Sequence, residues 1–184
     1  MLFTGKRPVC KEIFIKSNMH NWSISDSRLT YNIEKWGDGY FDISTNGNLS
    51  VSPKQNGVKI DISELSSQLI NSGLTFPVLI RFLDIIHNRI DRIESAFESA
   101  MMKFNYQANH SIVYPIKVNQ QQDVIDEIIS HGKYRIGLEA GSKPELIAVL
   151  SKSAPGSTVI CNGYKDEEYI RLAILGQQIG LKIF

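Results

Sequence analysis

The chain has 184 residues, of which 42% are hydrophobic and 21% are charged, a balance typical of a globular protein with a sizeable core. Its net charge is +1, and its basic residues form no clustered stripe, so nucleic acid is not an expected partner. No segment approaches the roughly 20 apolar residues of a membrane helix, and the N-terminus carries no apolar run of signal-peptide length. We therefore expect no association with membranes.

The cysteines and histidines predict no metal or redox centre. Cys10 and Cys161 lie far apart and match no metal-binding or redox spacing, which fits a reducing compartment. The histidines likewise lack ligand spacing. We expect a soluble, cytoplasmic protein with no metal site among these residues.

Residues 1–60 have the texture of a β-rich segment, with short β-prone pieces separated by turn residues. The runs "WGDGYFDIS" (36–44) and "GNLSV" (47–51) lie on either side of an Asn-Gly pair. This arrangement is a strong local signal for a β-hairpin. The aromatic residues around the two glycines of "WGDGYF" indicate a tight turn with core contacts.

From residue 61 onward the pattern alternates between helix and strand. A helix is predicted from an N-cap at Asp61, with Glu64 at its third position, to a stop at Gly73. A strand at 76–82 and a long amphipathic helix at 84–104 follow. Beyond them we predict strands at 112–118, 134–139, 157–161 and from 181, and helices at 121–131, 143–152 and 165–179.

The later strands begin about every 23 residues, the pitch of repeated βα units. Such units form a parallel sheet covered by helices, so the fold class is α/β. Residues 77–184 are too few for a closed eight-stranded barrel, which needs roughly 250 residues. The pattern alone fits an open doubly wound sheet or an incomplete barrel.

Lys117 is the first candidate for chemistry. It follows the β-prone run of "VYPIKVNQ" (113–120), where the carboxyl end of a strand would place it at the edge that carries active sites in βα proteins. Two interpretations stay open at this point: a lysine that extends its amine to solvent, or an amine that forms a Schiff base. Pro115 cannot donate to a sheet, which favours special local geometry.

Two further strand ends carry polar side chains. Glu139 ends the next predicted strand and would face the same edge as Lys117, either to orient a cofactor or simply as a solvated carboxylate. Asn162 ends the strand after that, where a turn role competes with hydrogen bonding to a ligand. Ser142 and Glu145 form a capping-box pattern, and the acids at 166–168 suit a helix N-terminus. The chain contains no phosphate-binding loop motif and no assembled nucleophilic triad.

In order, the motifs "WGDGYFDI", "FPVLIRFLDII", "NYQANHSIVYPIKVNQQ", "GLEAGSKPEL" and "ICNGYKDEEYI" resemble the amino-terminal part of the biosynthetic arginine decarboxylase family, over about residues 31–184. Its wider relatives are the alanine racemase-like, fold-type III pyridoxal-phosphate decarboxylases. The resemblance implies the amino-terminal part of a (β/α)8 (TIM) barrel, incomplete in this chain and preceded by short strands of a β-domain. Residues 1–60 would form the β-rich segment and residues 61–184 the partial pyridoxal-phosphate-binding barrel.

The resemblance also implies an activity, the decarboxylation of L-arginine to agmatine and CO₂ in polyamine (spermidine) biosynthesis. Lys117 would bind pyridoxal 5′-phosphate covalently, and Glu139 would lie beside the cofactor. Members of the family are described with Mg²⁺, for which the sequence shows no ligand set, and with homo-oligomeric assembly. Leu83 departs from the family pattern, where proline is more familiar.

Two other interpretations remain open at the level of the sequence. The family's glycine-rich phosphate site and its acid facing the pyridine nitrogen have no counterpart in these 184 residues. The chain could therefore be a non-catalytic remnant, or a fragment that acts in assembly with other chains, and independent activity is not expected. A small α/β binding domain would fit the βα pattern but leaves the motifs unexplained.

Overall fold

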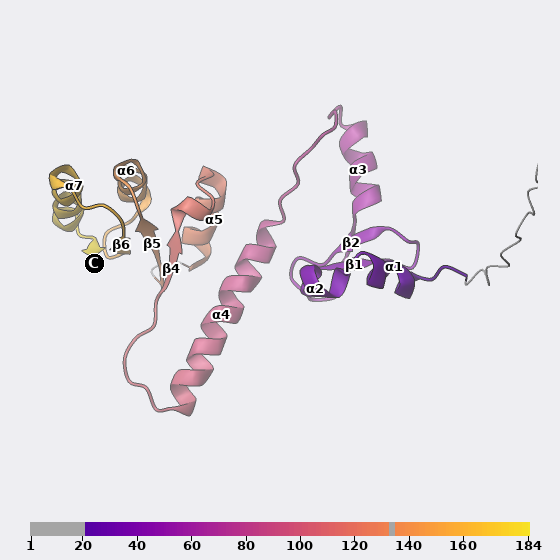
Figure 1. Cartoon of the computed structure of the whole chain (residues 1–184), viewed down its shortest axis with the longest axis horizontal. Coiled ribbons are helices and arrows are strands. Elements are labelled where there is room, and N and C mark those ends of the chain that lie inside the picture. Colours follow the sequence, from indigo (N-terminus) through magenta and orange to yellow (C-terminus); the bar gives the residue numbers. More distant parts are fainter. Residues whose placement is uncertain (1–20, 133–134) are drawn as a thin grey trace, which may run out of the picture.

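The computed structural model describes residues 21–132 and 135–184. Figure 1 shows an antiparallel sheet in the first part of this chain and a parallel sheet in the last, with the long helix α4 (Leu83–Lys103) between them. Cys10, His20, residues 1–20 of the predicted β-rich segment and residue 134 of the predicted strand 134–139 lie outside the described residues.

The antiparallel sheet contains the predicted hairpin. Its strands, in spatial order, are β1 (Phe41–Ile43), β2 (Leu49–Val51) and β3 (Ile60–Asp61), and two short helices precede them, α1 (Ile24–Thr30) and α2 (Ile33–Gly37). Gly47 in the β1–β2 turn has a φ of 82°, which glycine adopts without a steric cost. Its N–H donates to the Ser44 carbonyl at 2.9 Å. The hairpin prediction at Asn46-Gly47 is confirmed.

Helix α3 (Ile62–Asn71) begins and ends where the sequence predicts. The Asp61 carboxylate accepts hydrogen bonds from the N–H groups of Ser63 and Glu64 at 2.8 and 3.2 Å, which satisfies two of the donors that a helix N-terminus leaves free. Gly73 follows the helix with a φ of 90°. Helix α3 contacts β2 and β3 and therefore lies with the first sheet. The division of the chain into two domains at residue 60 stays a prediction.

The predicted strand at 76–82 is wrong for the described structure. This segment runs between α3 and α4 without strand geometry. Its composition is β-prone, but a strand also needs a neighbour to hydrogen-bond, and no described strand pairs with it. Pro77 lacks a donor, and Phe76 and Leu79 are exposed.

Helix α4 matches the predicted amphipathic helix to within one residue. Part of its apolar face packs on α5 (Gln122–Gly132), where Ile90 joins Val124 and Ile128 in one buried cluster, whereas Ile93 and Phe97 are exposed. Glu94 is buried on the same helix, and its carboxylate pairs with the Arg135 guanidinium at 2.9 Å. This partner offsets part of the cost of burying the carboxylate.

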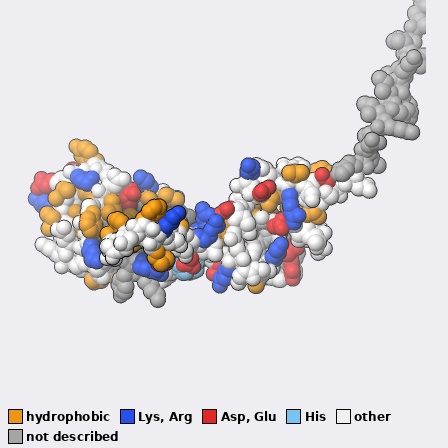
Figure 2. All heavy atoms as spheres, turned by 90° about the horizontal axis from the view of Figure 1, so that it is seen from below, with side chains coloured by type: hydrophobic (Ala, Val, Ile, Leu, Met, Phe, Trp, Pro, Cys, Tyr) orange, Lys and Arg blue, Asp and Glu red, His pale blue; other side chains and the backbone are white. Residues whose placement is uncertain are grey.

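The contact between the first sheet and α4 is polar. The Tyr40 hydroxyl donates to the Asn88 side-chain oxygen at 2.7 Å, and Asp38 pairs with Arg89 and with Arg92, the latter at 3.2 Å. The three charged side chains are each about half exposed. Figure 2 shows this region as a narrow waist at which acidic and basic side chains gather.

The parallel sheet has its strands in chain order, which confirms the α/β prediction. They are β4 (Ile112–Pro115), β5 (Ile136–Ala140), β6 (Thr158–Cys161) and β7 (Lys182–Ile183). Because βα crossovers are right-handed, strands in this order carry their helices on one face, as Figure 1 shows for α5, α6 (Lys143–Lys152) and α7 (Glu167–Gln178). The arrangement is that of a partial barrel.

The core lies between this sheet and its helices. Leu138 and Val159 from the strands meet Leu146 and Val149 from α6, and all four are at most 2% exposed. Tyr169 of α7 is fully buried beside them. Its hydroxyl donates to the Ala140 carbonyl at 2.8 Å, and burial raises the pKa of this hydroxyl above its ordinary value.

The Tyr169 ring and hydroxyl make separable contributions to stability. We expect Tyr169→Phe to lower the free energy of unfolding by about 1 kcal/mol, the typical value of one hydrogen bond. Tyr169→Ala removes the ring as well and is expected to cost about 3–5 kcal/mol. Urea denaturation of both variants measures the difference. Equal losses would show that the ring contributes nothing beyond its hydroxyl.

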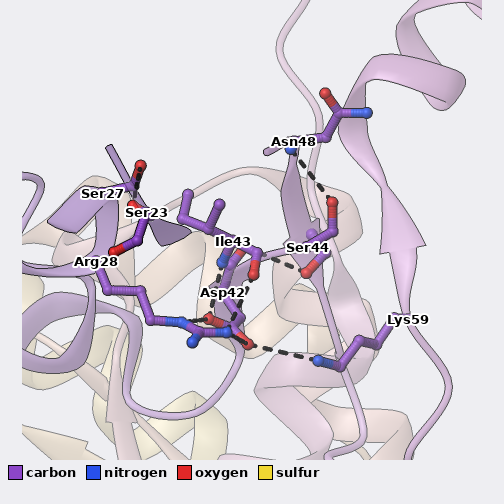
Figure 3. A network of polar contacts seen from close by, with 9 residues as sticks. Ser23, Ser27, Arg28, Asp42, Ile43, Ser44, Asn48 and Lys59 are labelled. Atoms are coloured by element: carbon purple, nitrogen blue, oxygen red, sulfur yellow. Dashed lines mark hydrogen bonds and ion pairs between the residues drawn. The ribbon is translucent and has the colours of Figure 1, made fainter. Parts of the chain in front are cut away.

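A second polar network stabilises the first part of the chain (Figure 3). The Arg28 guanidinium of α1 donates to both oxygens of Asp42 in β1, at 2.7 and 3.0 Å, and to the Ile43 carbonyl at 3.1 Å. Lys59 approaches the same carboxylate at 3.5 Å. Hydrogen bonding from Arg28 is the main cause that holds the pKa of Asp42 below its usual range.

This lowered pKa predicts a pH-dependent contribution to stability. The unfolded chain protonates Asp42 near its ordinary pKa of about 4, whereas the folded chain does so at lower pH, so the stabilisation is present above that value and lost as the pH falls through the folded pKa. We expect Asp42→Asn to be less thermally stable than wild type at pH 7. The gap should close as the pH falls below about 4. A gap that stays constant over this range would contradict the assignment.

Candidate functional site

Lys117 lies just beyond the end of β4, in the short 3₁₀ helix η1 (Ile116–Val118). The predicted strand 112–118 is therefore too long, because β4 ends at Pro115, which has no N–H for the sheet. In a continued strand Ile116 and Val118 would share one face, but the tight turn separates them: Ile116 is buried, whereas Val118 is 69% exposed. Lys117 itself has a 59% exposed side chain.

Glu139 of β5 is brought next to Lys117, as predicted. In the parallel register Pro115 lies opposite Glu139. Lys117 is two residues after Pro115 and therefore lies near the end of β5. The Glu139 Oε1 and Lys117 Nζ atoms are 3.5 Å apart. The Glu139 side chain is only 15% exposed, so its carboxylate faces this edge from a largely buried position.

Asn162, directly after β6, completes the arrangement. Its side-chain Nδ2 donates to Glu139 Oε1 at 3.0 Å, the same oxygen that Lys117 approaches. From the sequence, Asn162 is a possible hydrogen-bonding residue for a ligand, but a turn role is favoured. The structure shows instead a side chain directed at Glu139. Three successive strand ends thus contribute an amine, a carboxylate and an amide.

Two glycines let the loops at this edge pack closely. Gly163 has a φ of 136°, and a Cβ built there would lie 2.1 Å from the Gly141 carbonyl oxygen. No side chain fits at that distance without movement of the backbone. The Asn162 N–H also donates to the Ala140 carbonyl at 2.9 Å, which fixes the backbone next to the candidate site.

Gly163→Ala is expected to destabilise the chain more than Gly156→Ala. Gly156 also has a positive φ, of 87°, but a Cβ there would meet nothing within 4 Å. The control therefore carries the conformational cost, about 1–2 kcal/mol, without the clash. We expect at least twice that loss for Gly163→Ala in thermal or urea denaturation. Equal losses would mean that the loops do not need this close approach.

The predicted capping box is present in an altered form. The Ser142 hydroxyl accepts from the Glu145 N–H at 3.4 Å, as expected of an N-cap. The Glu145 carboxylate, however, accepts from the Gly141 N–H at 2.7 Å and from the Gln120 side chain at 3.1 Å. It therefore links the segment after Lys117 to the loop after β5, a contact between distant residues that no sequence pattern indicates.

Among the acids at 166–168, one caps α7 as predicted, and two form ion pairs with Lys143 of α6. The Asp166 carboxylate accepts from the Tyr169 N–H at 3.0 Å, which caps α7. It also pairs with Lys143 Nζ at 2.9 Å, and Glu168 pairs with the same amine at 2.6 Å. The hydrogen bond from Lys143 is the main cause that lowers the pKa of Asp166. The N-termini of α6 and α7 are thereby joined near the candidate site.

The donor set fits a carbonyl cofactor better than a metal ion. Lys117 offers a primary amine that is open to solvent, and Glu139 offers one largely buried carboxylate beside it. In residues 21–132 and 135–184, no group of three or more His, Cys, Asp or Glu side chains is placed to hold a metal ion.

Over the same residues, no helix is long and apolar enough to cross a membrane.

Comparison with known proteins identifies the family. The family "Pyridoxal-dependent decarboxylase, pyridoxal binding domain" matches residues 90–181, which include all three strand ends. The chain belongs to this pyridoxal-dependent decarboxylase family. Among curated proteins, this chain is 48% identical over 167 residues to the biosynthetic arginine decarboxylase of Alkalilimnicola ehrlichii, covering 90% of this chain and 27% of that protein.

Two further similarities agree. The biosynthetic arginine decarboxylase of Pseudomonas aeruginosa is 46% identical over 170 residues, covering 92% of this chain and 27% of the relative. The crystal structure of the biosynthetic arginine decarboxylase from Campylobacter jejuni matches with a TM-score of 0.75 and 33% identity, covering 83% of this chain and 25% of that one. The chain spans about a quarter of the length of these proteins.

Proposed function

We propose that the chain serves in the pyridoxal-phosphate-dependent decarboxylation of L-arginine to agmatine and CO₂, and that Lys117 is the residue that binds the cofactor. The observation that carries the proposal is an exposed primary amine at the carboxyl edge of a parallel sheet, in a chain that belongs to the pyridoxal-dependent decarboxylases. Arginine as substrate rests on the similarity to biosynthetic arginine decarboxylases.

Lys117, Glu139 and the loops after β5 and β6 each have a separate role in this proposal. When bound, pyridoxal phosphate supplies an electron sink for the electron pair left on the α-carbon as CO₂ departs. Lys117 holds the cofactor through its amine, in a position set by β4 and η1. Glu139 gives this amine a nearby negative charge and so orients it. The tightly packed loops after β5 and β6 keep Glu139 and its neighbours fixed at the edge.

Further features of the proposal rest on the family resemblance alone. These are homo-oligomeric assembly, a cytoplasmic location, a role in polyamine biosynthesis, and Mg²⁺, for which we assign no residue. We also propose that Lys117 and Glu139 are the cofactor-binding residues of this part of the barrel.

A second candidate function is assembly with another polypeptide without catalysis by this chain. The outer edges of β4 and β7 pair with no strand in the described part of the chain, and parallel sheets are normally continued or covered at such edges. Release of CO₂ from carboxyl-labelled L-arginine by the purified chain distinguishes the two. Release favours the enzyme, and its absence together with cofactor binding favours assembly.

The cofactor assignment predicts selective labelling of Lys117. We expect incubation with pyridoxal phosphate, followed by borohydride reduction, to add a pyridoxyl-phosphate mass to the peptide that contains Lys117. The yield at Lys117 should exceed that at Lys165, an exposed lysine of the β6–α7 loop, by about tenfold or more, because a formed site concentrates the reagent. Peptide mass spectrometry measures both yields.

Variants give the matched controls for this labelling. Lys117→Ala should abolish the selective site, whereas Lys165→Ala should leave labelling at Lys117 unchanged. Equal labelling of Lys117 and Lys165 in the wild-type chain would show that Lys117 reacts like any exposed lysine, and would overturn its role. Faster CO₂ release from L-ornithine or L-lysine than from L-arginine would overturn the substrate assignment.

A further inference from the structure

We infer that Asn162 is a positioning residue that acts on Lys117 through Glu139, by holding the Glu139 carboxylate toward the amine. This inference deepens the proposed function and rests on it for its catalytic meaning. It gives Asn162, directly after β6, a role beyond the turn role that the sequence favours.

The geometry points to Asn162 as the stronger of the two partners of Glu139. Its Nδ2 lies 3.0 Å from Glu139 Oε1, a normal hydrogen-bond length, whereas Lys117 Nζ lies 3.5 Å away, at the outer limit. The Lys117 side chain is 59% exposed and has four rotatable bonds, so this weak contact alone would hold neither group. The short amide side chain has few conformations to lose.

The backbone at Asn162 and Gly163 is held by two contacts. Its N–H donates to the Ala140 carbonyl, which also accepts from the buried Tyr169 hydroxyl. The adjacent Gly163 packs against the Gly141 carbonyl. Asn162 therefore presents its amide from a rigid support, although the residue itself is exposed. Side chains are held in productive geometry most effectively when they are carried on such rigid supports.

The burial of Glu139 explains why a neutral donor is needed. A carboxylate that is only 15% exposed requires hydrogen-bond partners, or it turns toward water. Asn162 satisfies one oxygen without adding a charge. When this donor is removed, the carboxylate is free to turn away, and the positive charge of Lys117 loses its negative neighbour. Lys117 Nζ, no longer held toward Glu139, is then more accessible to an electrophile.

The test is competitive labelling of lysines with acetic anhydride at pH 8, without cofactor. We expect Asn162→Ala to raise the labelling rate of Lys117 two- to threefold relative to Lys165, the size of change that a partly exposed ion pair allows. Lys152, which pairs with Asp126 at 2.7 Å between α6 and α5, reports whether the fold is intact. Its labelling should not change. If it rises, Asn162→Ser, which retains more of the side chain, is used instead.

A matched control and a double-mutant cycle separate positioning from a structural role. Asn48→Ala removes a similar amide-to-carboxylate bond, to Asp61 at 2.9 Å, from the first sheet and should leave Lys117 unchanged. Glu139→Ala should raise the labelling of Lys117 as much as Asn162→Ala does. In the double variant, loss of Asn162 should add nothing, because both residues act through one carboxylate.

The outcomes distinguish this inference from the proposed function. No change in Asn162→Ala, or an increase that adds in full to that of Glu139→Ala, overturns the positioning role. Failure of the pyridoxal-phosphate labelling while the cycle behaves as expected overturns the cofactor role of Lys117 and leaves the positioning of its amine standing. Selective pyridoxal-phosphate labelling of Lys117 together with a fully additive cycle overturns the positioning role of Asn162 and leaves the cofactor role of Lys117 standing.

Discussion

The hydrogen-bonded register among β4, β5 and β6 is the constraint on which the candidate site depends. Parallel strands in chain order end at one edge, and the pairing of Pro115 with Glu139 and of Ala140 with Cys161 sets which residues emerge there together. Lys117, Glu139 and Asn162 are 22 and 23 residues apart in sequence, one βα unit each. A shift of a single residue in either ladder would separate their side chains, since alternate residues face opposite ways.

The helices stabilise this register from one side by two kinds of contact. The apolar core of Leu138, Leu146, Val149 and Val159 is fully enclosed and supplies the non-directional part of the stability. Ion pairs then connect successive helices, Lys152 with Asp126 and Lys143 with Asp166. These pairs are partly exposed and individually weak, but their geometry specifies how neighbouring βα units align.

The sequence predicts elements whose signals are local. Helix α6 is found at its observed bounds because Ser142 caps it, and α4 is found because its apolar residues recur at helical spacing. The segment 76–82 fails because β-propensity is local whereas strand pairing is not. The Lys117–Glu139 contact follows from strand ends meeting at one edge. The Asn162–Glu139 and Gln120–Glu145 bonds depend on side-chain rotamers and on loops that approach across the fold, which no local pattern records.

The waist between the two sheets has a different physical character from either sheet. Its contacts are hydrogen bonds and half-exposed ion pairs from Asp38 and Tyr40 to α4, in place of a continuous apolar core. Exposed ion pairs weaken as the salt concentration rises and the Debye length falls below its value of about 8–10 Å at 0.1–0.15 M, whereas apolar packing is not weakened by screening. Salt therefore loosens the junction before it loosens the parts that it joins. The strength of this junction therefore depends on the ionic strength of the solution as well as on the chain itself.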